Sequence, residues 1–377
     1  SHTVRQLGEA SERIVTLDNL SKGFRDAVLY GDFVEGDTAD SALVSKILND
    51  YQVDTVVHFA AHTIVPESMA DPLKYYRNNT CATRNLLQCC TAAGVKHFVF
   101  SSTAAVYGIP ESEQCWEDTP TQPINPYGMS KLMTEHMLRD LGASSDLRYV
   151  ILRYFNVAGS DPQGRIGQST PGATLLMKVA AEQAVGKREA LYIFGTDYPT
   201  PDGTGIRDYI HVEDLADAHL KAIDYLRAGG GPQTLNCGYG HGYSVREVLD
   251  MVQRVHGAPL NIIEQGRRAG DPPALIAGAD KIREVLGWTP RYDDLEEIAR
   301  RLPRAELFLV VDEFSFRFDS GRIRPLPLPK IVMPADAFVG DVESAARQHR
   351  DIERAANEVE QLFAGNDGFG GRAAIEK

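Results

Sequence analysis

The chain has 377 residues, of which 43% are hydrophobic and 24% charged, and its formal net charge is -13 at pH 7. The composition is that of a soluble globular protein, and the length allows two domains or one large α/β domain with a smaller lobe. The acidic balance argues against nucleic acid or an anionic membrane as a partner, and no run of roughly 18 apolar residues predicts a membrane span. The five cysteines show no Cys-x-x-Cys spacing, which predicts reduced thiols, a cytoplasmic location and no metal site.

Strand-like and helical stretches alternate along the first part of the chain. We predict helices over residues 1–10, 40–51, 66–93 and 127–141, and strands over residues 13–17, 53–59, 96–103 and 147–154. This alternation is typical of βαβ units, so the expected fold class is α/β, with a doubly wound, Rossmann-like parallel sheet covered by helices on both faces. From Asp161 onward the composition shifts toward Gly, Pro and Thr, and a smaller carboxyl-terminal substrate lobe is expected to begin there.

An acidic residue follows the first predicted strand. Asp18 and Asn19 stand directly after residues 13–17. In a doubly wound fold such a carboxylate can hydrogen-bond the adenosine ribose hydroxyls and repel a 2′-phosphate, which favours NAD over NADP. An ordinary Asp-Asn turn is an equally good interpretation of this pair.

The glycine-rich turn that binds a dinucleotide pyrophosphate is expected just before the helix of residues 1–10, where the chain begins. Two interpretations follow: the sequence is a fragment of a longer enzyme, or another segment supplies the central strand of the sheet. The apolar run Leu-Phe-Leu-Val-Val at residues 307–311 is our candidate for such a strand, because unpaired buried backbone is costly.

The stretch of residues 96–131 carries the strongest chemical signal. An apolar strand ends in Ser-Ser-Thr at Thr103, and a helix begins with Tyr127 and Lys131 at i and i+4. Because such residues share one helix face, the Lys131 ammonium is expected to lower the pKa of the Tyr127 phenol and make it a usable base. Thr103 can offer a hydroxyl to the same reacting oxygen. The Tyr-x-x-x-Lys spacing by itself is common on ordinary helices, and the preceding hydroxyls make the catalytic interpretation much stronger.

This combination resembles the extended short-chain dehydrogenase/reductase family, and further motifs through residue 302 are similar to its UDP-glucose 4-epimerase members. The resemblance implies reversible epimerisation at C4 of UDP-hexoses (UDP-glucose and UDP-galactose) through bound NAD and a transient 4-keto sugar. It implies that Tyr127 removes the 4-hydroxyl proton while NAD takes the C4 hydride, that Lys131 also bonds the nicotinamide ribose, and that Thr103 aligns the proton transfer. It further implies a homodimer formed through the helices of residues 66–93 and 127–141.

The resemblance also implies which residues contact NAD. They are Asp18, Asn19, Asp37, Thr38, Phe59, Ala60, Ala61, Thr63, Asn78, Tyr127, Lys131 and Phe155. Many family members have lysine at the position of Thr63. For Asn78 the alternative is a core amide satisfied by a loop. His58 and His62 are not expected to form an acid/base pair, because one of them is expected to be buried in the strand and the other to line the turn.

A second group of residues is expected to hold the UDP-sugar. An aromatic pair, Tyr192 and Phe194, suits a base to stack, and arginines such as Arg207 and Arg268 suit a diphosphate, especially in an acidic protein. A surface ion pair is the alternative for either arginine. By resemblance the substrate-binding residues are Thr103, Asn156, Leu175, Leu176, Tyr192, Phe194, Arg207, Arg268, Asp271 and Leu275. Leucine at position 275 leaves acceptance of UDP-GlcNAc open.

We divide the chain into an NAD-binding domain that lacks its first strand (residues 1–160), a lobe that mainly binds the UDP-sugar (161–303) and a tail of unknown role (304–377). Two alternatives remain. Another extended family member, such as a nucleotide-sugar dehydratase, would place acidic residues after Thr103, where this chain has Ala104 and Ala105. The other is a truncated, catalytically silent chain that retains sugar-nucleotide binding, and NAD held by the purified protein would distinguish it.

Overall fold

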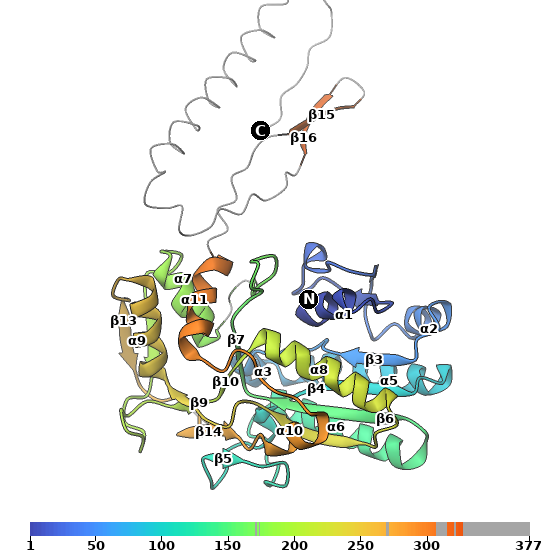
Figure 1. Cartoon of the computed structure of the whole chain (residues 1–377), viewed down its shortest axis with the longest axis horizontal. Helices are drawn as coiled ribbons and strands as arrows, with labels where there is room; N and C mark the ends of the chain where they lie inside the picture. The colour runs from blue at the N-terminus through green and yellow to red at the C-terminus, as the bar shows by residue number, and fades with distance from the viewer. Residues whose placement is uncertain (170–171, 173, 269–270, 307–314, 320–321, 327–377) are drawn as a thin grey trace, which may run out of the picture. The chain divides into compact units, whose positions relative to one another are not determined.

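The computed structural model describes residues 1–306 apart from 170, 171, 173, 269 and 270, together with two strands at 315–319 and 322–326 (Figure 1). The chain splits into two compact units, Ser1–Ala305 and Glu306–Lys377. In the second unit, β15 (Ser315–Asp319) and β16 (Arg322–Leu326) pair antiparallel with each other. The segment 307–311, our candidate for a central strand, lies outside the described residues.

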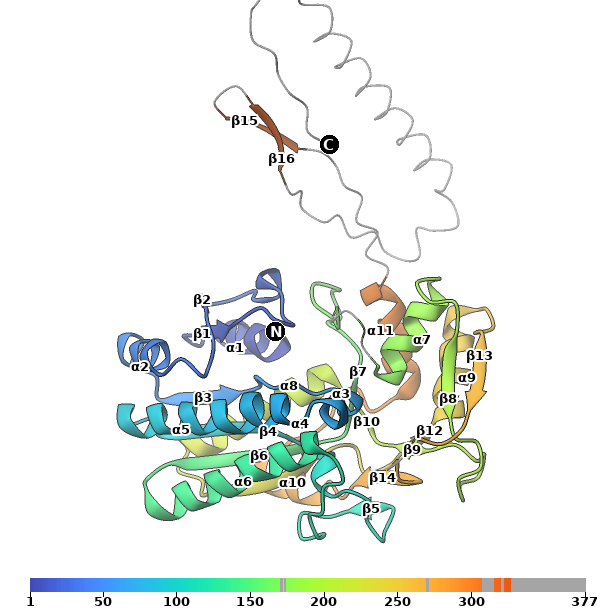
Figure 2. The same ribbon diagram turned by 180° about the vertical axis from the view of Figure 1, so that it is seen from behind.

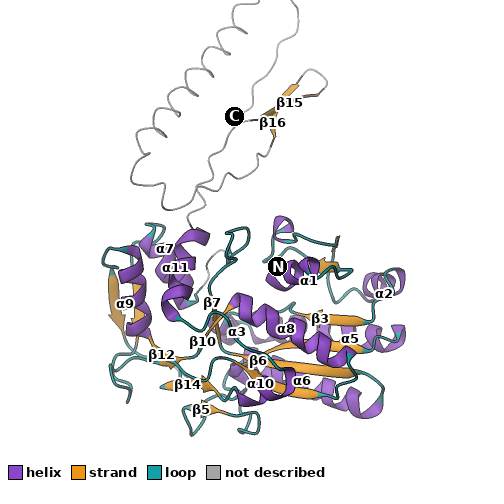
Figure 3. Ribbon diagram, in the orientation of Figure 1, coloured by secondary structure: helices purple, strands orange, loops and turns teal. Residues whose placement is uncertain are grey.

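The centre of the first unit is a four-stranded parallel sheet (Figure 3). Its order is β11-β6-β4-β3, formed by β3 (Thr55–His58), β4 (His97–Thr103), β6 (Arg148–Tyr154) and β11 (Gln233–Cys237). Helix α8 (Val212–Arg227) covers one face, and α5 (Ala82–Ala93) and α6 (Pro126–Ser144) cover the other, as comparison of Figures 1 and 2 shows. The predicted α/β class is confirmed.

Side chains of β4 alternate between the two faces of this sheet. Val99 packs in the cluster on the α8 side, while Phe98 and Phe100 pack in the cluster on the α5 and α6 side. The alternation continues into the hydroxyls at the carboxyl end, because Ser101 hydrogen-bonds α8 and Ser102 hydrogen-bonds α6. The end of β4 therefore presents polar groups to both faces.

Two strands stand apart from the central sheet. β1 (Val15–Asp18) and β2 (Asp32–Glu35) pair in parallel, flanked by α1 (His2–Glu9) and α2 (Ser41–Asp50). β1 pairs with β2 alone and β3 pairs with β4 alone, and among the described residues no strand joins β1 to β3. The doubly wound sheet is thus present as two separate parallel pieces in the part of the chain that the structure describes.

The single helix predicted over residues 66–93 is wrong. The segment forms α3 (Val65–Ala70), α4 (Pro72–Tyr75), a π-helical turn (Tyr76–Cys81) and α5. The break occurs because Pro72 has no N–H to continue the helix, while the Asp71 side chain accepts the backbone N–H of Lys74 and so starts a new one. Asn78 and Asn79 lie in the π-helical turn.

The remaining elements complete the first unit, and most of them fall in the part of the chain predicted as the substrate lobe. They are β5 (Gln114–Cys115), β7 (Asn156–Ala158), α7 (Leu176–Ala184), β8 (Leu191–Phe194), β9 (Ile206–Arg207), β10 (Tyr209–His211), β12 (Tyr243–Ser244), α9 (Val245–His256), β13 (Ile262–Gln265), β14 (Ala274–Ala277), α10 (Asp280–Leu286) and α11 (Leu295–Glu306). Short 3-10 turns occur at Arg25–Ala27, between β1 and β2, and at Ala104–Val106, after β4. The pairs are β7 with β10, β8 with β13, and the order β12-β9-β14-β5.

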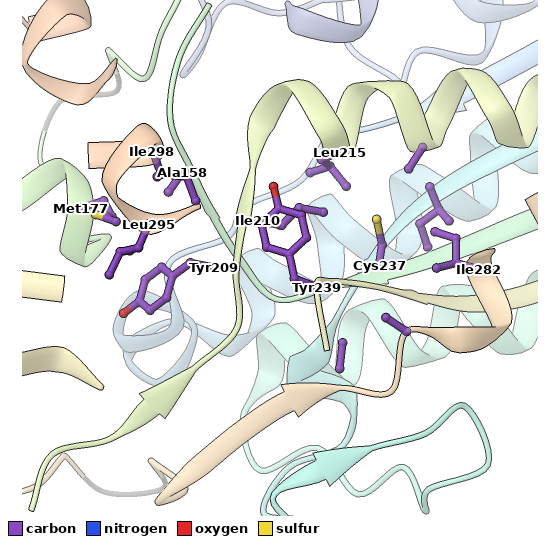
Figure 4. Close-up of a cluster of buried hydrophobic side chains, with 14 of the residues drawn as sticks. Ala158, Met177, Tyr209, Ile210, Leu215, Cys237, Tyr239, Ile282, Leu295 and Ile298 are labelled. Atoms are coloured by element: carbon purple, nitrogen blue, oxygen red, sulfur yellow. The ribbon is translucent and has the colours of Figure 1, made fainter. Parts of the chain in front are cut away.

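One buried cluster joins the lobe to the sheet. Figure 4 shows members of this cluster, which includes Ile210, Leu215 and Cys237 on the side of the sheet and Met177, Tyr209 and Ile298 on the side of the lobe. Close packing of this kind resists displacement, so the lobe is held in a fixed position over the carboxyl ends of the strands. Among the described residues, no helix combines the length and apolarity that crossing a membrane requires.

Candidate active site

Thr103, Tyr127 and Lys131 come together where β4 ends and α6 begins. Asn125 caps the helix, because its side-chain oxygen accepts the Gly128 N–H at 2.8 Å. A Cβ at Gly128 would lie 2.5 Å from the Ala105 carbonyl oxygen, so glycine is needed for the helix to approach the turn after Thr103 this closely. The Tyr127 phenol is 8% exposed and hydrogen-bonds the Thr103 side chain.

The pKa of Tyr127 in the structure differs from the sequence-based expectation. The Lys131 Nζ donates to the Ser101 carbonyl at 2.7 Å and lies 4.9 Å from the centre of the Phe100 ring. Burial lowers the pKa of Lys131 to about 7, and the carboxylate of Glu135 opposes this shift. Burial also raises the pKa of Tyr127, with the Thr103 hydrogen bond acting the other way. The expected lowering of the Tyr127 pKa is wrong for the protein by itself, because desolvation of the phenolate is the larger effect.

Four of the predicted cofactor residues gather at the carboxyl ends of β1 and β2. Asp18 ends β1 and accepts the Leu20 N–H at 2.8 Å, and the Asn19 amide donates to the Asp37 carboxylate at 2.8 Å. The Thr38 carbonyl accepts from the Asn85 side chain at 2.7 Å. The structure thus presents carboxylates and an amide together at one sheet edge, as ribose hydroxyls require.

The turn after β3 is tied to α6 by an asparagine that sequence reasoning missed. Asn79 is 2% exposed, accepts the His62 N–H at 2.8 Å and donates to the His62 carbonyl at 2.9 Å. Its amide also lies 3.0 Å from the Ser130 hydroxyl of α6. Asn78 is half-buried and donates to the Asn79 side chain at 3.0 Å. An Asn-Asn pair inside a helical stretch was the only signal in the sequence.

The rest of that turn faces outward. Phe59 is 44% exposed, Ala60 and Thr63 are exposed, and Ala61 is half-buried. The two histidines behave as expected: His58 is buried against the Thr83 hydroxyl at 2.7 Å, and burial lowers its pKa to about 3, while His62 is half-buried in the turn. Neither is placed as a partner of the other.

The carboxyl ends of the two parallel pieces together carry groups that fit a nicotinamide dinucleotide. The carboxylate of Asp18 suits a ribose diol, the exposed Phe59 and the small Ala60 allow a flat ring system to approach the backbone, and Lys131 supplies a donor next to Ser101. Phe155, which follows β6, packs against both the main core and the cluster under α6. Among the described residues no group of His, Cys, Asp and Glu could hold a metal ion, and all five cysteines are free.

The predicted substrate residues of the lobe also come together. The Arg268 guanidinium lies 3.7 Å from the centre of the Phe194 ring, and the Tyr192 and Phe194 rings are 6.3 Å apart. Arg207 Nη2 lies 3.7 Å from the Asp271 carboxylate. Tyr192 is 46% exposed, so an aromatic face and two guanidinium groups are available at one place. This combination suits a base and a diphosphate.

The lobe residues reach the catalytic residues through a small buried cluster. Leu275 lies opposite Arg207 in the pairing of β14 with β9. Like Phe155, it packs against the buried cluster of Ala104, Val106, Tyr107, Cys115 and Leu132, whose members come from the turn after Thr103, from β5 and from α6. Asn156 opens β7 directly after Phe155, and Leu175 and Leu176 begin α7, which contacts β8. The two halves of the predicted site therefore adjoin.

A buried ion pair beneath Lys131 was also missed from the sequence. Glu135 and Arg153 are 0% and 2% exposed, and Arg153 Nη2 lies 2.6 Å from Glu135 Oε2. The signals were present, since an acid follows Lys131 by one helical turn and an arginine interrupts an apolar strand. Nothing in the sequence, however, indicated that the two side chains meet.

Comparison with known proteins agrees with this geometry. The family model described as "NAD dependent epimerase/dehydratase family" matches residues 1–238. The chain is 56% identical over 301 residues to a UDP-glucose 4-epimerase of Azospirillum brasilense, covering 80% of this chain and 86% of that protein. A UDP-glucose 4-epimerase of Lacticaseibacillus casei is 46% identical over 299 residues, with 79% and 90% covered.

Solved structures give the same result. The UDP-glucose 4-epimerase of Brucella ovis in complex with NAD matches with a TM-score of 0.78 and 44% identity, over 80% of this chain and 93% of that one. The enzyme of Bifidobacterium longum in complex with NAD+ and UDP matches with a TM-score of 0.78 and 36% identity, over 81% and 94%. The arrangement of Thr103, Tyr127 and Lys131 and these similarities lead to one conclusion: the chain belongs to the UDP-glucose 4-epimerase family.

Proposed function

We propose that the protein catalyses reversible epimerisation at C4 of UDP-hexoses, interconverting UDP-glucose and UDP-galactose. The observation that carries the proposal is the position of Tyr127, buried against Thr103, beside a lobe that offers Arg207 and Arg268. A proton-transfer group and a nucleotide-binding surface are thus supported by one buried cluster.

NAD is the cofactor of this proposal, and when bound it supplies a reversible hydride acceptor for C4. The residues that would hold it follow the carboxyl ends of both parallel pieces or belong to the helical segments beside them. They are Asp18, Asn19, Asp37 and Thr38 after β1 and β2, Phe59, Ala60, Ala61 and Thr63 after β3, Asn78 in the π-helical turn, Tyr127 and Lys131 of α6, and Phe155 after β6. The carboxylate of Asp18 at the end of β1 would repel a 2′-phosphate, which supports NAD over NADP.

Tyr127 is the proton-transfer group. As the phenolate it takes the proton of the sugar 4-hydroxyl, and as the phenol it returns a proton to the 4-keto oxygen. Thr103 holds the phenol by a hydrogen bond and aligns the transfer. With a pKa of about 7, Lys131 is partly charged near neutrality, and a charged Lys131 favours the phenolate.

The predicted substrate residues fall into two groups, one for the UDP half and one for the rest of the substrate. Arg207, Arg268 and Asp271 would hold the UDP half, with Tyr192 and Phe194 beside them, so that the 4-keto sugar can turn without leaving. Asn156, Leu175, Leu176 and Leu275 would line the rest of the substrate site.

Assembly and location are finer parts of the proposal. We place a homodimer interface on the helices α3, α4 and α6, where Met69, Leu73 and Met133 are 61%, 76% and 38% exposed. Apolar side chains grouped on adjoining helices support a protein interface. Leu73→Asp should then reduce the mass measured by light scattering to that of one chain. The free cysteines support a cytoplasmic location.

The test is turnover of UDP-galactose to UDP-glucose by the 377-residue chain, with and without added NAD. Tyr127→Phe should lower kcat by roughly 10²-fold or more while UDP binding persists. Tyr51→Phe, a change of the same chemistry at the end of α2, should leave kcat unaltered. Binding of UDP without any turnover by the unaltered chain would instead support a catalytically silent sugar-nucleotide-binding protein.

A further inference from the structure

Helix α6 carries a stripe of functional groups beyond Tyr127 and Lys131. Glu135 and Arg139 follow at the same four-residue spacing, so the stripe runs phenol, ammonium, carboxylate, guanidinium along one face. Glu135 is fully buried and accepts from the Ser102 hydroxyl at 2.6 Å and from Arg139 at 2.8 Å. A buried carboxylate one turn from Lys131 is a natural partner for its ammonium.

The carboxylate is held elsewhere, by Arg153 of β6. Arg153 Nε donates to Glu135 Oε1 at 3.0 Å and Nη2 donates to Oε2 at 2.6 Å, so both carboxylate oxygens are engaged in a bidentate pair. Arg153 is itself fixed, because Nη1 donates to the Tyr107 hydroxyl at 3.0 Å and Tyr107 in turn donates to Asn236 at 2.6 Å. The pair is therefore anchored to β6 and β11.

The position of Lys131 follows from this arrangement. Among the described residues no ion pair joins Lys131 to Glu135. An i,i+4 pair of a lysine with a carboxylate does form on the surface, between Lys46 and Asp50. The ammonium instead donates to the Ser101 carbonyl beside the end of β4. We propose that Arg153 is a positioning residue that holds the Glu135 carboxylate away from Lys131, so that the lysine charge remains available to Tyr127. This inference rests on the function proposed above.

The surroundings of Lys131 identify Glu135 as the charge that matters. On its own helix, Tyr127 lies one turn before Lys131, and Glu135, one turn after it, is the acid whose charge acts on the lysine. From β3, His58 faces it and is neutral near pH 7, since burial lowers its pKa to about 3. β4 contributes the Ser101 carbonyl and the Phe100 ring. Near Tyr127 itself, β6 places Tyr154, whose pKa is raised by burial.

The decisive variant is Arg153→Met. With Arg153 removed, Glu135 can turn to Lys131 and form an ion pair with it. The carboxylate charge then offsets the ammonium charge, so the Tyr127 phenolate becomes harder to form. The acidic limb of the kcat/KM profile should move up by about 1 pH unit, and kcat should fall roughly tenfold at a pH on that limb, with little change in KM. The double variant Glu135→Gln with Arg153→Met removes both charges. Its acidic limb should return to the pH of the unaltered chain, and most of kcat should be recovered.

A merely structural role would give a different pattern. If Arg153 served packing alone, the double variant would be as impaired as the single one and the pH limb would not move. The matched control is the exposed pair Glu296 and Arg300 of α11, for which Arg300→Met should change neither the limb nor kcat.

Two further measurements keep the inference separate from folding and from the proposed function. If Arg153→Met does not fold, Glu135→Gln is compared with the double variant. An acidic limb at the same pH in both variants supports the proposal, whereas an acidic limb that moves further when Arg153 is also lost overturns it. The ionisation of Tyr127 is also followed directly by phenolate absorbance, as the difference between each chain and its Tyr127→Phe counterpart. This titration should shift upward in Arg153→Met even if no chain turns over UDP-galactose, and an unshifted titration overturns the inference while the proposed function stands.

Discussion

The side chain of Asn79 forms two hydrogen bonds with the backbone of His62. It accepts the His62 N–H at 2.8 Å and donates to the His62 carbonyl at 2.9 Å. One buried amide thereby satisfies both polar groups of a residue in an otherwise outward-facing turn. Because Asn79 also reaches the Ser130 hydroxyl of α6, the turn that follows β3 is held in register with the helix of Tyr127 and Lys131.

Replacement of Asn79 by Ala should therefore impair both stability and cofactor binding. The loss leaves the His62 backbone unsatisfied, so the free energy of unfolding should fall by about 1–3 kcal/mol, and NAD should dissociate more readily from the loosened turn. Urea unfolding and the NAD content of the purified protein measure the two effects. Asn49→Ala, which removes an exposed side-chain bond to the Ser45 carbonyl, should alter neither. Normal NAD retention by the Asn79 variant would contradict the role of this clamp.

The arginines of the lobe should contribute to UDP affinity more than to the chemical step. We propose that each arginine makes a charge-assisted bond to phosphate worth about 1.5–3 kcal/mol, so UDP should bind roughly 10- to 100-fold more weakly to Arg207→Met or to Arg268→Met. Calorimetric titration with UDP measures this directly. Arg254→Met, at an exposed position of α9, serves as the control. A variant that lowers the melting temperature but binds UDP normally would assign that arginine to a surface ion pair.

The stability of the protein should depend on pH through buried histidine. Burial lowers the pKa of His58 from 6.5 to about 3, so between these values the unfolded chain binds a proton that the folded chain does not. The contribution of His58 to the free energy of unfolding is complete above pH 6.5 and is lost as pH falls toward 3. His58→Gln, which can keep a bond to Thr83, should reduce the loss by up to about 1.4 kcal/mol for each pH unit below the histidine value.

Urea unfolding at about pH 7.5, 6.5 and 5.5 tests this dependence above the range in which carboxylates titrate. The exposed His256 provides the control, since His256→Gln should leave the slope unaltered. His211 and His219 have pKa values lowered by burial to about 3 and about 4, so part of the slope will persist in the His58 variant. Parallel curves for the variant and the unaltered chain would exclude His58 as a source.

Glu213 should fix the first helix to the body of the protein. Its buried carboxylate, at the start of α8, accepts from Gln6 at 2.9 Å and pairs with His2 and Arg5 of α1. Glu213→Ala leaves the buried Arg5 with weaker partners and should cost about 3 kcal/mol of stability. Hydrogen exchange should then accelerate in α1 before other helices. The exposed Glu284→Ala provides the comparison, and unchanged protection of α1 would show that other contacts hold the helix.

Local patterns made much of the fold predictable. The strand at β4, its terminal hydroxyls and the Tyr127 to Lys131 spacing are short-range features, which the structure reproduces at the expected positions. The helix predicted over residues 66–93 was wrong at Asp71 and Pro72, although both residues are ordinary signals for a helix boundary.

What the sequence by itself determined was the α/β class and the family, because these depend on periodicity and on motifs within a few residues. The tertiary structure alone decided which distant groups meet: Asn79 with His62, Glu135 with Arg153, and Arg268 with Phe194. It also decided the direction of the Tyr127 pKa, since burial is a property of the packed molecule and exceeds the effect expected from Lys131. Desolvation and long-range contacts arise only when separate segments pack together, and no local stretch of sequence contains that information.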